Sequence, residues 1–217
     1  MTWRSATRAR FRATWPTARR TSPTRASTII SIFRSSSLPG LRATVEAFQG
    51  TSMATPHLAG SAAVVKSQHQ GWSAAQIRSA IVNTAAQGVL KKSSGSALES
   101  DVNVIGAGRE DLNSAVHAAV GLDPVSVSFG AVPAGSGQSL SQTVSLSGLD
   151  GGLGTVTVTV TGTTGSGVAF GATVSSGTVA VTMTAAQGAA AGDYQGILRI
   201  SRGGVEVAHA AVYAFIK

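Results

Sequence analysis

Residues 50–60 read Gly50-Thr51-Ser52-Met53-Ala54-Thr55-Pro56-His57-Leu58-Ala59-Gly60, and no formal charge follows until Lys66. Gly50 allows a close approach of the backbone just before the serine. Pro56 falls in the opening turns of a helix, where its missing N–H costs little, and Ser52 and Thr55 can satisfy free donors there. A helix that is apolar on nearly all sides is normally buried. The stretch therefore predicts a buried helix that begins directly after Gly50.

Ser52 is the residue of this stretch that can carry chemistry. A serine hydroxyl is a poor nucleophile unless a base takes its proton and donors stabilise the oxyanion. At the first turn of a helix, free backbone N–H groups and the positive end of the dipole favour such an anion. Gly-Thr-Ser is also a common helix cap for unrelated reasons. Position alone leaves both interpretations open.

The whole stretch resembles the serine motif of subtilisin-like proteases (subtilases) nearly letter for letter, with Leu58 where Val is commoner. The resemblance implies that Ser52 is the catalytic nucleophile and that its own backbone N–H is one oxyanion donor. It also implies that the helix packs against a parallel sheet. The other motif residues would be structural: Gly50, Thr51, Pro56 and His57.

His57 is not expected to be the catalytic base. It lies about one and a half helical turns beyond Ser52 and would face away from it. We expect a packed histidine that is satisfied by hydrogen bonds.

The fifty-one residues before Ser52 contain no Asp, no His and no Asn. In the family that the motif resembles, the triad Asp, the triad His and the oxyanion Asn all lie upstream of the serine. The resemblance therefore implies a parent endopeptidase acting on polypeptides through an acyl-enzyme, and a chain that is inactive alone. It implies no cofactor, and the sequence shows no metal-ligand cluster.

The residues after the serine helix agree with the resemblance. Ser73 followed by Gln76 is a capping-box signature, and Ile77 to Thr84 carry apolar residues at helical spacing. Subtilases have a similar Trp-Ser turn and a closing Asn-Thr-Ala. His69, on the connecting loop, is expected to be solvated.

Residues 87–105 predict a surface loop that ends in a short strand, Val102 to Ile105. The segment Gly106 to Val116 resembles the one that opens the last helix of a subtilase domain. Asp111 within it is expected to be a solvated or capping carboxylate, with no catalytic role.

The composition changes after Leu122, and Asp123-Pro124 indicates a linker. Residues 155–161 and 179–184 alternate with period two, and Gly-rich turns separate the runs. Such spacing favours an antiparallel sandwich, and about ninety-five residues suit one domain of that kind. The segments 125–129 and 192–201 resemble the fibronectin-III-like or immunoglobulin-like modules that follow many secreted subtilase domains.

The N-terminal segment carries all of the net charge. Residues 1–44 contain nine Arg and no acidic residue, whereas residues 45–217 hold eight basic and nine acidic residues. A nucleic-acid arm would fit the arginines, but Trp3, Phe11 and Trp15 form no convincing stacking surface. A transit peptide also fits the composition, and Arg19-Arg20 suggests a twin-arginine signal, although the apolar run at 29–33 is too short for one.

Out-of-frame translation of GC-rich DNA is the interpretation that we favour for this segment, with the true frame resuming near residues 30–43. Ser36 to Gly40 already resemble the turn that precedes the subtilase serine motif. On this hypothesis the segment is disordered or is not a selected protein sequence.

The sequence thus predicts an α/β remnant of a subtilisin-like domain followed by an all-β antiparallel sandwich. The expected boundaries are 1–43 for the basic segment, 44–121 for the subtilase part and 122–217 for the sandwich. The leading function is the C-terminal part of a secreted serine endopeptidase, and the alternative is a non-enzymatic binding or adhesion module carried by the sandwich. A nucleic-acid binder would rest on the basic segment alone, and no nucleic-acid partner is expected.

Other bounds come from the whole chain. It has no Cys, which excludes disulfides and thiolate metal sites, and no apolar run approaches a membrane span. The parent enzyme would be exported, although no signal peptide is readable, and the oligomeric state is not indicated.

Overall fold

The computed structural model describes residues 29–32, 45–48, 50–92, 94–133, 137–162 and 165–217. Apart from residues 29–32, the basic segment 1–43 lies outside the described residues, and so does the expectation that it is disordered. The short strands β1 (Ile29–Ile32) and β2 (Val45–Phe48) pair antiparallel. β1 therefore lies inside the segment that the sequence analysis set apart.

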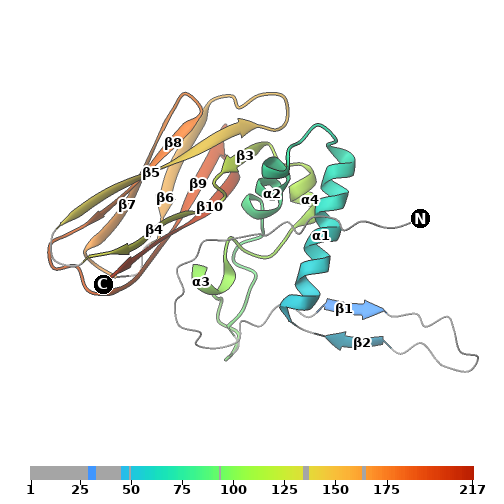
Figure 1. Ribbon diagram of the computed structural model, residues 1–217, viewed down its shortest axis with the longest axis horizontal. Coiled ribbons are helices and arrows are strands. Elements are labelled where there is room, and N and C mark those ends of the chain that lie inside the picture. The colour runs from blue at the N-terminus through green and yellow to red at the C-terminus, as the bar shows by residue number, and fades with distance from the viewer. Residues whose placement is uncertain (1–28, 33–44, 49, 93, 134–136, 163–164) are drawn as a thin grey trace, which may run out of the picture.

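The remaining elements fall into a helical part and a β-rich part (Figure 1). The helices are α1 (Thr51–Gln68), α2 (Ala74–Asn83), α3 (Val102–Ile105) and α4 (Leu112–Val116). The strands are β3 (Val120–Asp123), β4 (Val127–Val132), β5 (Gln138–Gly148), β6 (Val156–Thr161), β7 (Val168–Ser175), β8 (Thr178–Ala185), β9 (Gly192–Arg202) and β10 (Val205–Ile216).

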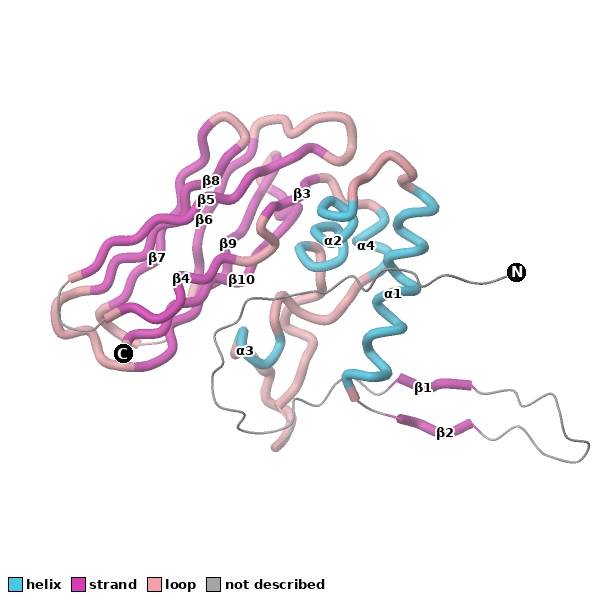
Figure 2. The backbone as a smooth tube through the Cα atoms, in the orientation of Figure 1, coloured by secondary structure: helices cyan, strands magenta, loops and turns pink. Residues whose placement is uncertain are grey.

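The β-rich part consists of two four-stranded sheets with the orders β4-β10-β9-β6 and β3-β5-β8-β7. Figure 2 shows both sheets on one side of the molecule and the helices on the other. Every strand pair in these sheets is antiparallel except β4 with β10, which is parallel. The first sheet is therefore mixed, where the sequence predicted purely antiparallel strands. Periodicity does not reveal strand direction, so the parallel pair could not be foreseen.

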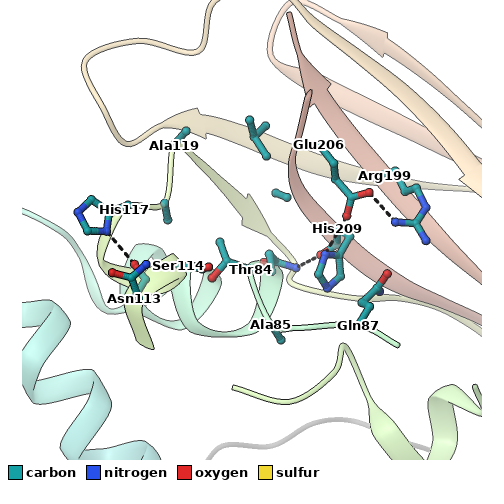
Figure 3. A pocket seen from close by; sticks show the side chains of 14 residues that line it. Thr84, Ala85, Gln87, Asn113, Ser114, His117, Ala119, Arg199, Glu206 and His209 are labelled. Carbon is teal, nitrogen blue, oxygen red and sulfur yellow. Dashed lines mark hydrogen bonds and ion pairs between the residues drawn. The ribbon is translucent and has the colours of Figure 1, made fainter. Parts of the chain in front are cut away.

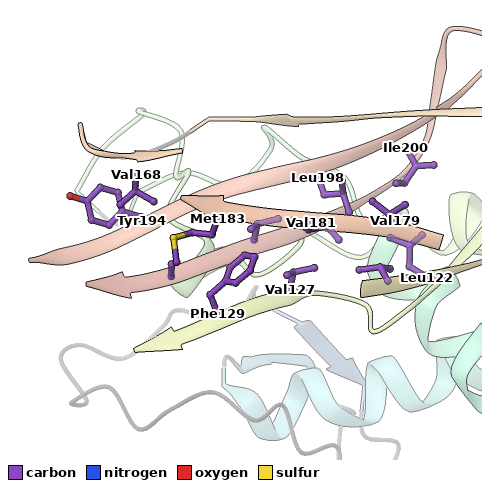
Figure 4. Close-up of a cluster of buried hydrophobic side chains, with 14 of the residues drawn as sticks. Leu122, Val127, Phe129, Val168, Val179, Val181, Met183, Tyr194, Leu198 and Ile200 are labelled. Atoms are coloured by element: carbon purple, nitrogen blue, oxygen red, sulfur yellow. The ribbon is translucent and has the colours of Figure 1, made fainter. Parts of the chain in front are cut away.

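Alternation along the strands builds the core between the two sheets. On β8, Val179, Val181 and Met183 are buried, and the residues between them are more exposed. Leu198 and Ile200 of β9 belong to the same cluster (Figure 4). The predicted period-two pattern of residues 179–184 is confirmed, because one face of the strand is buried and the other is not.

The helical part has a small core of its own. Val65 of α1, Ala80 of α2 and Ala115 of α4 are fully buried and share a cluster with Ala118 and Leu149. Because Leu149 directly follows β5, this cluster joins the helices to the β-rich part. α2 also packs directly against β3.

Two local predictions differ from the structure. Residues 102–105 form the short helix α3 instead of a strand, because Asp101 caps it by accepting from the N–H of Asn103 at 2.8 Å. Gln195 of β9 holds the same turn by accepting from the N–H of Val102 at 2.8 Å. Residues 122–123, read as the start of a linker, belong to β3, in which Val120 and Leu122 are fully buried.

Leu122 should contribute strongly to stability, because it is fully buried in β3 between the sheet core and α2. We expect Leu122→Ala to lower the free energy of unfolding by about 2–5 kcal/mol. Val205→Ala is the matched control, since that side chain is 67% exposed, and its effect should stay within about 0.5 kcal/mol. Urea unfolding followed by circular dichroism measures both. Equal effects of the two variants would contradict this placement of the core.

Candidate functional site

Ser52 lies exposed in the first turn of α1. Gly50 precedes the helix with φ +153° and ψ 167°, a conformation that is essentially restricted to glycine. Its carbonyl accepts from the N–H groups of Met53 and Ala54, both at 3.1 Å. The backbone thus turns sharply into the helix at the predicted place, and Ser52 stands at the positive end of the helix dipole.

The side chains of the first turn do not cap the helix as expected. No side-chain hydrogen bond caps the N-terminus of α1, and the Thr55 hydroxyl instead donates back to the carbonyl of Thr51 at 2.8 Å. A threonine within a helix commonly bonds the carbonyl one turn earlier. The free N–H groups of the first turn therefore remain available to an anion.

All four histidines lie in the described residues, and each has a partner other than Ser52. The recorded contacts join His57 to Glu110, His69 to Val116, His117 to Asn113 and His209 to both Glu206 and Ala107. Within the described part of the chain, no imidazole is hydrogen-bonded to the Ser52 hydroxyl. The base that a serine nucleophile needs is therefore not in place here.

His57 is hydrogen-bonded, as predicted, but it is exposed rather than packed. Its Nε2 lies 3.0 Å from Oε2 of Glu110, and its side chain is 56% exposed. The Glu110 side chain is only 13% exposed, and its other oxygen is buried without a partner among the described residues. This pair ties α1 to the segment that leads into α4.

His69 corrects a second expectation, because it is half-buried rather than solvated. Its ring stacks on Trp72 with centroids 3.7 Å apart and an interplanar angle of 5°. Its Nε2 lies 2.7 Å from the carbonyl of Val116. The turn after α1 folds back on itself, which the sequence pattern did not show.

Two capping predictions are confirmed. Ser73 and Gln76 form a capping box at α2, with side-chain contacts of 2.8 and 3.2 Å in the two directions. Asp111 caps α4 by accepting from the N–H of Ser114 at 3.0 Å. Hydrogen bonds from Ser114 lower the pKa of the Asp111 carboxyl below 3.8, because they favour its charged form.

The apolar surface of α1 is largely uncovered. Only Ser61 and Val65 of this helix are buried, whereas Leu58 and Val64 are 43% and 42% exposed. The sequence analysis expected a buried helix, and named Val65 among the side chains that would be exposed without a covering sheet. Val65 is instead fully buried against α2 and α4.

A cleft of about 500 Å³ lies away from Ser52, between the helices and the β-rich part. Figure 3 shows Thr84, Asn113 and His117 on one side of it, and Arg199, Glu206 and His209 on the other. The sequence analysis did not predict this cleft. It forms where α2, α4, β9 and β10 meet, and no local pattern encodes that meeting.

The strand side of the cleft carries a chain of charged contacts. Arg199 Nη1 lies 2.5 Å from Glu206 Oε2, and Glu206 Oε1 lies 3.2 Å from His209 Nδ1. His209 Nε2 is 3.0 Å from the carbonyl of Ala107. The prediction that His209 lies in the last strand is confirmed, and the side chain links that strand to the loop before α4.

Asn83 is the functional-looking polar residue that the sequence analysis missed. It is fully buried, and its Nδ2 donates to the carbonyls of Val125 at 2.8 Å and His209 at 2.7 Å. Its Oδ1 accepts from the hydroxyl of Ser79. The closing Asn-Thr-Ala of the predicted helix was the available signal, but it names no partner.

Among the described residues, no group of three or more His, Cys, Asp or Glu side chains is placed to hold a metal ion. No helix in that part of the chain is long and apolar enough to cross a membrane.

Residues 30–108 match the Subtilase family (Peptidase S8). Over 82 residues the chain is 44% identical to the Minor extracellular protease Vpr of Bacillus subtilis, a match covering 38% of this chain and 10% of that protein. Over 50 residues it is 52% identical to Subtilisin of Bacillus pumilus, covering 23% of this chain and 18% of the relative. The matched segment thus corresponds to less than a fifth of each relative. A subtilisin-like protease relationship is supported for the part that contains Ser52.

The solved structures that are similar lie in another direction. An endo-fucoidan hydrolase from glycoside hydrolase family 107 aligns with a TM-score of 0.35 and 9% identity over 46% of this chain and 14% of its own. A chimeric titin Z1Z2 aligns with a TM-score of 0.29 and 20% identity over 45% of this chain and 93% of its own. These scores are too low to assign a fold family.

The cap at Asp111 predicts a pH-dependent contribution to stability. Its folded pKa is lowered, so the contribution is present well above pH 3.8 and is lost as the pH falls through the folded pKa. At pH 7 we expect Asp111→Ala to cost about 0.5–2 kcal/mol.

Asp111→Asn is the control, because asparagine caps as well but does not titrate. The stability advantage of wild type over this variant should shrink on acidification from pH 6 to below 3. Thermal unfolding across that range measures it, and an advantage that grows instead would reverse the assignment.

The uncovered face of α1 should bind a hydrophobic dye. Contiguous apolar surface of this kind favours association. We expect the double variant Leu58→Ser, Val64→Ser to lower anilinonaphthalene sulfonate fluorescence by at least about twofold. Leu98→Ser is the comparison, because that side chain is 52% exposed on another segment. An unchanged signal in the double variant would show that the dye binds elsewhere.

Proposed function

We propose that the chain is the nucleophile-bearing C-terminal part of a secreted subtilisin-like serine endopeptidase. Ser52 Oγ attacks the scissile carbonyl, and the backbone N–H of Ser52 is one of the donors to the oxyanion. The observation that carries the proposal is the position of Ser52 in the first turn of α1, within the subtilase match.

The local geometry supports this role in three ways. Gly50 takes a backbone conformation reserved for glycine, so the turn into α1 is specified. No side chain caps the helix, so its first donors are free for an anion. The serine is also exposed, which a substrate carbonyl requires.

Catalysis by this chain alone is not expected. The fifty-one residues before Ser52 include no Asp, His or Asn, and the four histidines are engaged elsewhere. Removal of triad members leaves roughly 10³–10⁴-fold catalysis over water, which comes from the oxyanion hole and substrate binding. Here a second oxyanion donor would also have to come from elsewhere.

The remaining features of the proposed parent follow from the relatives. The Vpr protease is named an extracellular enzyme, which supports export of the parent, and a protease acts on polypeptides. The β-rich part would then be a fibronectin-III-like or immunoglobulin-like accessory sandwich, as its two facing sheets and buried core suggest. Gly50, Thr51, Pro56 and His57 keep their structural roles in this proposal.

A fluorophosphonate probe tests the role of Ser52. We expect the purified chain to be labelled no more than its Ser52→Ala variant, because no base contacts the hydroxyl. Selective labelling of Ser52 in the chain alone would contradict the predicted inactivity.

A chimera tests the proposed function itself. Residues 50–217 would be fused behind the part of Subtilisin E that precedes its matched segment, which supplies the missing groups. We expect the probe to label this chimera at Ser52 and to spare its Ser52→Ala version, with casein hydrolysis following the same pattern. A folded chimera that stays unlabelled would favour the alternative, a binding or adhesion module.

A further inference from the structure

The two edges of β10 are paired to different extents. On one side, β9 pairs with β10 from Val205 to Ile216. On the other side, β4 pairs with it only from Val212 to Ile216. In the described part of the chain, the first half of β10 therefore has one edge without a neighbouring strand. Such an edge presents unpaired N–H and C=O groups that can pair with another chain.

Asn83 marks where this open edge ends. Its side-chain amide donates to the carbonyl of His209 at 2.7 Å, so that carbonyl faces α2 and not β9. In an extended strand the N–H and C=O of one residue point to the same neighbour, so the N–H of His209 faces the same way. The edge from Val205 to Ala208 lies beyond the amide.

An irregularity in the pairing adds to the supply of free groups. The register with β9 shifts between Glu206 and Ala208. A bulge of this type leaves the backbone of the extra residue, Val207, without a partner on the adjacent strand. Val207 is also half-exposed and lines the cleft.

The cleft lies directly beside this edge (Figure 3). Val207, Ala208 and His209 line it from the strand, and Ala85, Ala118 and Ala119 line it from the helical part. Its volume of about 500 Å³ falls in the range of ordinary ligand sites. The alanines leave room for a side chain that projects from a segment lying along the strand.

The charges around the cleft favour an uncharged occupant. Arg199 is paired with Glu206, and the second oxygen of Glu206 faces His209. A charged ligand group would have to compete with these contacts. An extended peptide backbone is neutral and alternates donors with acceptors, which suits a strand edge.

We propose that the cleft beside the first half of β10 binds an extended, uncharged polypeptide segment by β-strand addition. The segment pairs with the backbone between Val205 and His209, ends at the Asn83 amide, and places one side chain over the alanine-lined wall. The site does not involve Ser52, so it stands whether or not the proposed protease function holds.

Amide NMR of the ¹⁵N-labelled full chain tests the proposal. The probe is the capped tetrapeptide N-acetyl-Val-Thr-Val-Thr-amide, titrated to about 5 mM, a range that detects millimolar affinity. We expect shifts at Val207, His209, Thr84 and Ala119. An analogue methylated at every backbone nitrogen should bind at least about tenfold more weakly, because it cannot donate to the strand. Ser52→Ala should leave binding unchanged.

Variants separate the cleft from the rest of the surface. Ala119→Phe fills the cleft and should weaken peptide binding at least about tenfold, whereas Ala131→Phe, on an exposed position of β4, should not. If Ala119→Phe fails to fold, the comparison with the N-methylated peptide decides alone. The proposal is overturned by absence of shifts, by shifts confined to other strands, by equal binding of the methylated analogue, or by maltotriose moving the same resonances.

Discussion

The arrangement of the molecule depends on the buried amide of Asn83. This side chain sits at the end of α2 and bonds two backbone carbonyls, one before β4 and one in β10. Ser79, one turn earlier, donates to Asn83 and accepts from the N–H of Leu122 in β3. Because an unpaired amide buried here would cost about 1–3 kcal/mol, α2 is held in one position against both sheets. Everything else in the helical part is built on α2.

The parts of this structure that the sequence predicted are those encoded over a few residues. The turn at Gly50, the capping box of Ser73 and Gln76, and the cap at Asp111 each depend on neighbours in the chain, and all three were found in place. Strand positions followed from period-two alternation for the same reason. Asn83, by contrast, bonds residues 42 and 126 positions away, and no local pattern specifies such partners. The cleft and the parallel pair of β4 with β10 escaped prediction on the same physical ground, and α3 escaped because its strand-like Val-Asn-Val-Ile run is overruled by the Asp101 cap and by Gln195.

The two parts of the chain differ in how completely they bury their apolar residues. In the β-rich part, two sheets face each other and leave their large core side chains almost fully buried. In the helical part, α1 contributes Val65 to a five-residue cluster and leaves Leu58 and Val64 exposed. Burial of a large aliphatic side chain contributes about 1.5–3 kcal/mol, so α1 is held mainly by Val65 and by the His57–Glu110 pair. The residues with the strongest family signal are thus the ones least supported by packing within the described chain.

This difference separates the two chemical features of the molecule. Ser52 is carried by α1, whose apolar face still lacks a cover, so its catalytic competence depends on groups that are not among the described contacts. The cleft beside β10 is built from α2, α4 and the sheets, which are fixed to one another by Asn83, His209 and the buried cluster around Ala80. α2 and α4 are common to both features, since α1 packs against them on one side and the β-rich part on the other. A segment bound along β10 would therefore act on α1 only through α2 and α4, and the rigidity that Asn83 gives to α2 argues that the two features function independently.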